Sequence, residues 1–291
     1  MSDFLVSSST EFCNRNLEQL DMPFFEASGL TFHYADDNVD RLPFVFQHGL
    51  GADIRQPMSF FGGDRPFRLI SMDCRGHGRT VPLGDPNFLR FNSFSNDIIN
   101  LLDHLNLSKV VIGGISMGAG IALNFAVRYP ERARALILSR ASWLAEPLPP
   151  NLAVFPKIAG FIREHGSRRG KELFASTAEC QTALQSSPAN AASWMVQFLR
   201  ERADETFEIL ESIPKDIPAP DIASWRKIDF PTLVLACRND LQHPFAYGQV
   251  LAREIPGARF AEITGKAISG QKHVEDVRRE ILQFIGEIDP K

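Results

Sequence analysis

Apolar segments of two different periods alternate along the chain. Between strand-like segments, apolar residues recur every three to four positions over 94–105 and 117–129, and again over a last segment at 273–285, as in amphipathic helices. Short runs rich in β-branched and aromatic residues predict strands at 24–27, 30–34, 42–47, 67–72, 109–115, 133–139, 231–237 and 258–263. This alternation predicts an α/β fold with flanking helices around a mostly parallel, eight-stranded sheet.

The alternation stops in one long stretch. Over 143–225 no strand-like run is evident, apolar residues recur at helical spacing, and prolines cluster near both borders. Proline clusters of this kind are typical of domain boundaries, because proline ends helices and cannot donate a backbone hydrogen bond. We therefore predict a core formed by residues 1–142 and 226–291, with a helical insertion at 143–225.

Composition excludes several classes of protein. The 291 residues are 44% hydrophobic and 23% charged, which is ordinary for a globular protein. The net charge of -4 gives no basic surface, so we expect no nucleic-acid partner. The apolar runs are too short to span a membrane, and the first residues do not resemble a signal peptide. A cytoplasmic location is expected, whereas the oligomeric state stays open.

The cysteines give no sign of a metal site. Cys13, Cys74, Cys180 and Cys237 are far apart and form neither a C-x-x-C pair nor a zinc-binding spacing. Free thiols, as in a reducing compartment, are the expected state. The sequence therefore predicts no bound metal.

The strongest chemical signal is a glycine-rich turn between a predicted strand and a predicted helix. Residues 113–120 read Gly-Gly-Ile-Ser-Met-Gly-Ala-Gly and contain the pattern G-x-S-x-G. A serine nucleophile at this place needs a tight, strained turn, and Gly114 and Gly118 remove the side chains that would collide there. Ser116 is therefore the candidate nucleophile. An incidental serine in a glycine-rich turn is the competing interpretation.

This segment resembles the nucleophile elbow of the α/β-hydrolase superfamily, and in particular of its capped, esterase- and lipase-like members. His48-Gly49 resembles the oxyanion loop of that family, 73–78 its D-x-R-G-H-G loop, and 231–240 the strand and turn that carry its catalytic acid. The helical insertion matches the position of the family's cap domain. The resemblance implies a catalytic triad in the chain order nucleophile, acid, histidine.

The resemblance also implies roles for particular residues. The oxyanion hole would be formed by the backbone N–H groups of Met117 and Leu50. His48 and His77 are expected to be structural. Asp240, just beyond the predicted seventh strand, is the candidate acid, because the alternative position after the sixth strand reads Ser-Arg-Ala without a carboxylate.

The histidine fits the family pattern less well. The usual Gly-His pair is absent from 264–269, which reads Thr-Gly-Lys-Ala-Ile-Ser. His273 is the histidine that follows this segment, and we expect the loop before it to bring it to Ser116 as the general base. His243, which shares the loop of Asp240, is the rival and is expected to have a structural or pocket-edge role.

These features predict a serine hydrolase that cleaves a small, apolar carboxylic ester or lactone through an acyl-enzyme, without a metal or an organic cofactor. The family also contains acyltransferases, perhydrolases and carbon–carbon bond hydrolases, and a non-enzymatic ligand-binding relative with an impaired triad is a further alternative. The apolar side chains of the insertion that we expect to line the site of a small-molecule substrate are Trp143, Phe155, Phe161, Met195 and Phe198.

Overall fold

The computed structural model describes residues 22–62 and 65–290. Its sheet has eight strands in the order β1-β2-β4-β3-β5-β6-β7-β8. The strands are β1 (Phe24–Ala27), β2 (Leu30–Asp36), β3 (Leu42–Gln47), β4 (Phe67–Met72), β5 (Val110–Ile115), β6 (Ala133–Ser139), β7 (Thr232–Ala236) and β8 (Arg259–Glu262). Each strand lies where the sequence predicts it, within two residues at either end.

The sheet is mostly parallel. Strands β4, β3, β5, β6, β7 and β8 pair in parallel, whereas β1 and β2 form an antiparallel hairpin and β2 pairs antiparallel with β4. The hairpin turns at Ser28 and Gly29, which both have positive φ angles, of 51° and 75°. Two such residues match the right-handed twist of the flanking strands. The predicted α/β class and sheet are confirmed.

Helices cover both faces of the sheet. Helices α3 (Phe91–His104), α4 (Met117–Arg128) and α10 (Phe245–Glu254) contribute to one buried cluster, and α2 (Arg55–Phe60) and α11 (Gly270–Ile288) to the other. Strand β3 shows why both clusters form: Phe44 and Phe46 face one, and Val45 between them faces the other. Successive side chains of a strand point to opposite faces of the sheet, so a strand in a sheet that is buried on both faces must be apolar at every position.

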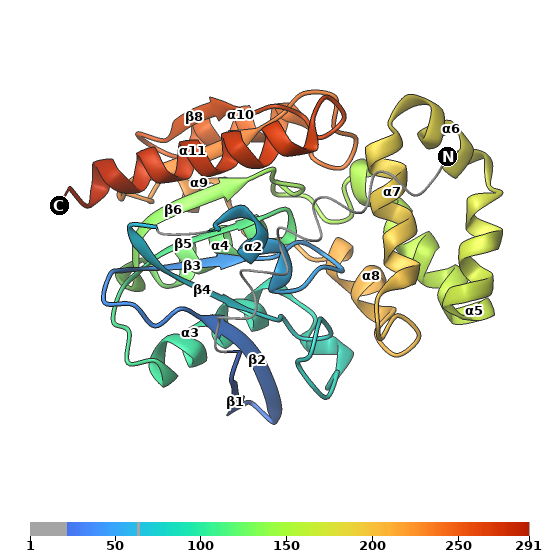
Figure 1. The fold of residues 1–291 in the computed structure, drawn as a ribbon, viewed down its shortest axis with the longest axis horizontal. Coiled ribbons are helices and arrows are strands. Elements are labelled where there is room, and N and C mark those ends of the chain that lie inside the picture. The colour runs from blue at the N-terminus through green and yellow to red at the C-terminus, as the bar shows by residue number, and fades with distance from the viewer. Residues whose placement is uncertain (1–21, 63–64, 291) are drawn as a thin grey trace.

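Four helices between β6 and β7 form a separate lobe beyond the carboxyl ends of the parallel strands (Figure 1). We call residues 154–215 the helical lobe. It contains the helices α5 (Val154–Ala175), α6 (Ala178–Ser186), α7 (Pro188–Val196) and α8 (Glu208–Ser212), and the 3-10 turns η4 (Gln197–Leu199) and η5 (Ile213–Lys215). A further 3-10 turn, η3 (Pro150–Leu152), precedes the lobe. The short helix α9 (Ile222–Trp225) lies beside the sheet instead (Figure 1).

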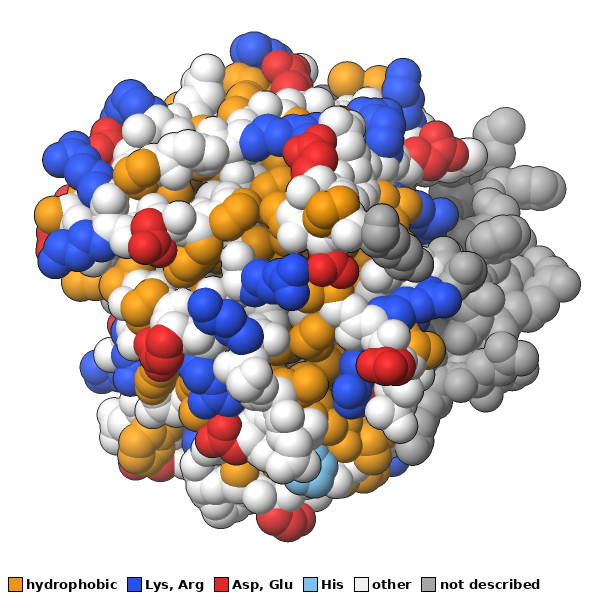
Figure 2. Space-filling view, turned by 90° about the vertical axis from the view of Figure 1, so that its left-hand side faces the viewer, with side chains coloured by type: hydrophobic (Ala, Val, Ile, Leu, Met, Phe, Trp, Pro, Cys, Tyr) orange, Lys and Arg blue, Asp and Glu red, His pale blue; other side chains and the backbone are white. Residues whose placement is uncertain are grey.

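The charges on the surface and the lengths of the helices are those of an ordinary globular protein. The face opposite the helical lobe carries acidic and basic side chains mixed together, with apolar atoms between them (Figure 2). Two more 3-10 turns, η1 (Pro86–Phe88) and η2 (Pro130–Arg132), complete the elements. Within residues 22–62 and 65–290, no helix combines the length and apolar character that crossing a membrane would take.

Candidate active site

Ser116 occupies a strained turn between β5 and α4. Its φ and ψ angles are 58° and -114°, a region that residues with a side chain rarely adopt. A Cβ atom on Gly114 would lie 2.3 Å from the Gly118 carbonyl carbon, and one on Gly118 would lie 2.2 Å from the Gln47 carbonyl oxygen. Only glycine fits at either position, so the G-x-S-x-G spacing is a packing requirement of this turn.

The Ser116 hydroxyl has two polar neighbours. Its Oγ lies 3.0 Å from His243 Nε2 and 3.1 Å from the Oγ of Ser142. Ser142 is buried and belongs to the segment that follows β6. No motif in the sequence singles out Ser142, since only the folded chain brings this segment to the turn after β5.

A carboxylate completes a linear arrangement with the serine and the imidazole. His243 Nδ1 lies 2.9 Å and 3.0 Å from the two carboxylate oxygens of Asp240. Both residues belong to the loop between β7 and α10, and both side chains are less than a tenth exposed. The structure thus brings Ser116, His243 and Asp240 into hydrogen-bond contact, and Asp240 lies just beyond β7, as the sequence predicts.

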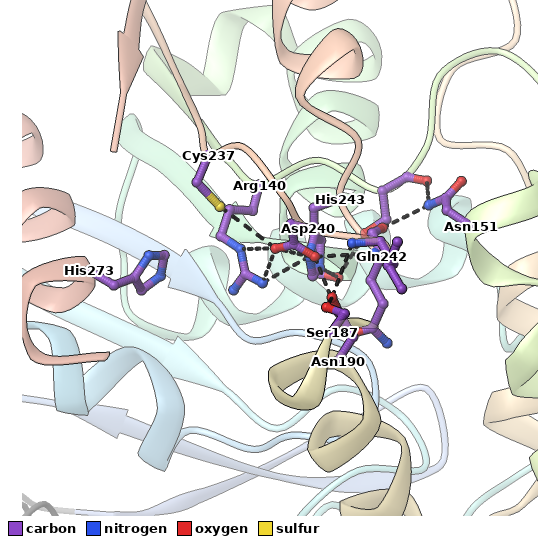
Figure 3. A network of polar contacts seen from close by, with 12 residues as sticks. Arg140, Asn151, Ser187, Asn190, Cys237, Asp240, Gln242, His243 and His273 are labelled. Carbon is purple, nitrogen blue, oxygen red and sulfur yellow. Dashed lines mark hydrogen bonds and ion pairs between the residues drawn. The ribbon is translucent and has the colours of Figure 1, made fainter. Parts of the chain in front are cut away.

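The expectation that His273 reaches Ser116 is wrong. His273 Nδ1 lies 2.8 Å from the carbonyl oxygen of Thr264, and its ring packs near Phe60. Figure 3 shows it well apart from the Asp240–His243 pair. The reason is the start of α11: Ser269 caps the helix by accepting a hydrogen bond from Lys272 N, so His273 lies in the first turn and not in an extended loop.

His243 consequently occupies the position that we had assigned to His273, and it is not at the edge of the site. One sequence signal pointed to it. The family's Gly-His pair is missing at 264–269, and a histidine stands three residues after the candidate acid, before Pro244. A separation of three residues lets one tight turn present both side chains together.

Arg140 contacts both partners of this pair from the end of β6. Its Nε donates to Asp240 Oδ2 at 3.0 Å, and its Nη2 lies 2.9 Å from His243 Nδ1 (Figure 3). The guanidinium and the carboxylate are each 7% exposed, so solvent screens this ion pair little. In the sequence, Arg140 attracts attention only because the segment Ser-Arg-Ala after β6 contains no carboxylate.

Burial and charge set the protonation of the pair. Burial, followed by the Arg140 cation, lowers the pKa of His243 to about 4 against the opposing effect of Asp240. Burial on its own would raise the pKa of Asp240, but His243 and Arg140 outweigh it and hold this pKa well below the usual range of a carboxyl. At neutral pH the imidazole is therefore neutral and the carboxylate ionised, which is the state that a general base requires.

The two candidate oxyanion donors lie next to Ser116. Met117 is the first residue of α4, where a backbone N–H has no acceptor within its own helix. Leu50 follows Gly49, and a Cβ on Gly49 would lie 3.4 Å from Ser116 Cβ, so this loop packs directly against the serine. Their role as donors to an oxyanion stays a prediction.

Two further histidines hold loops in place. His48 Nε2 accepts a hydrogen bond from Cys74 N at 3.0 Å, which ties the loop after β3 to the loop after β4. His77 Nδ1 lies 2.9 Å from the Arg75 carbonyl oxygen, and its ring packs against that of His48. These contacts agree with the structural roles expected for both residues.

The cysteines and acidic groups that the structure describes form no metal-binding cluster. Among the residues that the structure describes, no three His, Cys, Asp or Glu side chains are placed to hold a metal ion. Cys74, Cys180 and Cys237 are buried free thiols, and Cys13 lies outside the described residues. Burial raises the pKa of Cys237 to about 11, so this thiol stays protonated beside Asp240.

The side chains expected to line a substrate site are all at least partly buried. Trp143 packs on Phe91 with ring centroids 5.3 Å apart. Phe161 and Phe198 both pack on Phe174 inside the helical lobe. The remaining two, Phe155 and Met195, belong to the same apolar cluster. A contact with substrate stays a prediction for all five.

Comparison with known proteins gives a family model and several relatives. The model described as the alpha/beta hydrolase fold matches residues 43–265. The 3-oxoadipate enol-lactonase 2 of Acinetobacter baylyi is 26% identical over 79% of this chain and 83% of its own length. A 2-hydroxy-6-oxononadienedioate/2-hydroxy-6-oxononatrienedioate hydrolase of Pseudomonas putida is 27% identical over 97% of this chain and 98% of its own.

Two other similarities show less, because one covers a short segment and the other has low sequence identity. A putative 2-succinyl-6-hydroxy-2,4-cyclohexadiene-1-carboxylate synthase of Bacillus subtilis is 44% identical, but over 24% of this chain and only 26% of that protein. The crystal structure of the enol-lactonase from Burkholderia xenovorans superposes with a TM-score of 0.68 at 22% identity, covering 90% of this chain and 99% of the other. The second similarity supports the fold alone.

Proposed function

This chain belongs to the α/β-hydrolase fold family, and from that premise we propose that it is a serine hydrolase of small, apolar carboxylic esters or lactones. The observation that carries the proposal is the unbroken contact from Ser116 through His243 to Asp240. These three groups are the nucleophile, base and orienting acid that acyl transfer to water requires.

Each member of the triad has a defined part in the proposed reaction. His243 Nε2 takes the proton of Ser116 Oγ as the hydroxyl attacks the substrate carbonyl. Asp240 holds the proton of His243 on Nδ1 and stabilises the imidazolium that forms. The N–H groups of Met117 and Leu50 stabilise the oxyanion. As the oxyanion collapses, the ester C–O bond breaks, His243 gives its proton to the leaving alcohol oxygen, and the acyl-enzyme remains. Water that loses a proton to His243 then attacks the acyl-enzyme, and the acid leaves as the proton returns to Ser116 Oγ.

The position of the helical lobe suggests how the protein would select its substrate. We propose that the helical lobe, which lies within the insertion predicted at 143–225, acts as a cap, because it stands over the carboxyl ends of the strands that precede Ser116 and Asp240 (Figure 1). A cover of this kind excludes water from the reacting groups and selects the substrate. The lactones that the sequence predicts within the substrate class are supported by a relative that is named as an enol-lactonase.

Carbon–carbon bond hydrolysis is the second candidate function. It is favoured by the relative from Pseudomonas putida, which is named as a hydrolase of an oxodienedioate and matches nearly the full length of both chains. The same triad serves either reaction, so the substrate decides between them. Turnover of a vinylogous 1,5-diketone at a rate well above that of any ester would favour this alternative.

The two histidines provide the test of the proposed triad. We expect His243→Ala to lower kcat on an activated ester by roughly 10⁴-fold or more, as for loss of a triad member, and to abolish labelling of Ser116 by a fluorophosphonate. His273→Asn is the matched control, because an amide can still donate to the Thr264 carbonyl, and it should stay within a few-fold of wild type.

Thermal unfolding of each variant shows whether the fold is intact, and Ser116→Ala defines the rate without a nucleophile. A folded His243→Ala protein with near-normal activity would refute the proposed base. A wild-type protein that is neither labelled nor active on any ester would refute the proposed hydrolase.

A further inference from the structure

Two carboxamide side chains lie on one side of the helical lobe, seven residues apart. Asn190 is in α7, and Gln197 is the first residue of η4, which continues directly from α7. Seven residues make almost two full helical turns, so the two side chains project from the same face, about 10 Å apart along the axis. Their exposed fractions are 4% and 6%, which places both against other parts of the protein.

Asn190 contacts the acid of the triad. Its Nδ2 donates to Asp240 Oδ1 at 3.0 Å and to Gln242 Oε1 at 3.1 Å (Figure 3). Its Oδ1 accepts from Leu241 N at 3.1 Å and from Ser187 Oγ at 2.6 Å. One lobe side chain therefore holds both the carboxylate of Asp240 and the backbone of the loop that carries it.

Gln197 contacts the loop after β3 at the other end of the same helical face. Its Nε2 lies 3.4 Å from the Leu50 carbonyl oxygen. Gly51 has a φ of 73°, and a Cβ there would lie 1.8 Å from Gln197 Oε1, so the carboxamide fills the space that a side chain would take. This is the loop from which Leu50 is proposed to donate to the oxyanion.

We propose that α7 and η4 form a positioning element that sets the acid and the oxyanion loop of the catalytic site at the same time. The inference rests on the proposed function and extends it, because the lobe then completes the catalytic geometry in addition to covering substrate. Arg140 donates to Asp240 Oδ2 and Asn190 donates to Asp240 Oδ1, so the two donors fix the carboxylate from both sides. Gln197 fixes the Leu50–Gly51 backbone relative to Ser116.

The proposal predicts effects on turnover and not on substrate affinity. Without Asn190, Oδ1 of the carboxylate loses its donor from the lobe, so Asp240 keeps its contact with His243 but holds the imidazole less firmly in the orientation that faces Ser116. We expect Asn190→Ala to lower kcat by roughly 10- to 100-fold, as for loss of a hydrogen bond to a charged group, with KM within about twofold. Gln197→Ala should lower both kcat and the rate of fluorophosphonate labelling of Ser116.

A pH profile gives a readout that a purely structural role would not change. The charged groups that act on His243 are Asp240 on its own loop, Arg140 after β6 and Lys266 after β8, and the variants keep all three. Removing the Asn190 donor leaves the Asp240 charge less stabilised, so imidazolium is favoured. The acid limb of kcat/KM and the imidazole pKa of His243, followed by NMR, should therefore rise in Asn190→Ala.

Gln181→Ala is the matched control, because Gln181 is an exposed lobe carboxamide whose Nε2 donates to Ala175 O within the lobe. The inference would be overturned if folded Asn190→Ala and Gln197→Ala kept the wild-type kcat, labelling rate and imidazole pKa. It would also be overturned if only KM changed, or if Gln181→Ala showed the same losses. If wild type is inactive and unlabelled, the proposed function fails, and the NMR shift of His243 alone decides the positioning role.

Discussion

Replacing Arg140 should move the pH dependence of the proposed reaction. The guanidinium Nη2 lies 2.9 Å from His243 Nδ1, and both groups are nearly buried. A cation in this place opposes the imidazolium that forms when His243 acts as base. Arg140→Gln removes the charge and keeps a side chain that can donate to Asp240, whereas Arg140→Lys keeps the charge and loses the planar, bidentate contact.

The size of the effect follows from the geometry. Two unit charges about 4 Å apart interact by about 4 kcal/mol at an effective dielectric constant of about 20, which corresponds to about 3 pKa units as an upper bound. Part of the guanidinium charge is already balanced by Asp240. We expect the pKa of His243 to rise by about 1 to 2 units from its value of about 4 in Arg140→Gln.

The direction of the shift in the pH profile depends on which protonation state of His243 is active. The neutral imidazole is the base, so kcat/KM falls as pH drops through the pKa of His243 in the free enzyme. A higher pKa moves this acid limb upward, toward the value of about 6.5 for an unperturbed histidine. The assay is kcat/KM on an activated ester between pH 3.5 and 8, with an ester whose own hydrolysis is pH-independent over that range.

Stability must be measured beside activity, because the change removes one partner of a buried ion pair. Such a loss costs about 3 to 5 kcal/mol. Urea unfolding at each pH restricts the comparison to folded protein. An acid limb that stays in place in folded Arg140→Gln, or that shifts equally in Arg140→Lys, would refute the electrostatic reasoning.

Two further predictions concern the acid and the turn. Asp240→Asn should lower kcat by about 10⁴-fold, because the amide favours the wrong tautomer of His243, and it should also lower the melting temperature, because it removes the buried charge that pairs with Arg140. A near-normal kcat in the folded variant would mean that another group is the acid. Gly118→Ala should unfold at lower urea concentration and lose activity, since its Cβ would lie 2.2 Å from the Gln47 carbonyl oxygen. Gly160→Ala in α5 is the control, because its Cβ meets only Arg163 Nη2 at 3.9 Å, and equal stability of the two variants would contradict this account.

The sequence by itself determined the sheet and the G-x-S-x-G turn, and its resemblance to α/β-hydrolases pointed to Asp240 as the candidate acid. The sheet and the turn depend on local information: strand and helix periods, and two glycines at fixed spacing around Ser116. The position of a residue at the carboxyl end of a parallel strand follows from the strand alone, so Ser116 and Asp240 could be placed at one edge of the sheet before the fold was known.

Only the tertiary structure decided which histidine meets the serine. Both His243 and His273 can reach the sheet edge by chain length, and the choice depends on where α11 begins and on the turn after β7. Arg140, Ser142 and Asn190 were equally hidden, because their partners lie 100, 26 and 50 residues away and no local pattern encodes such contacts. Side chains that position one another across the fold are set by packing, which a single sequence does not display.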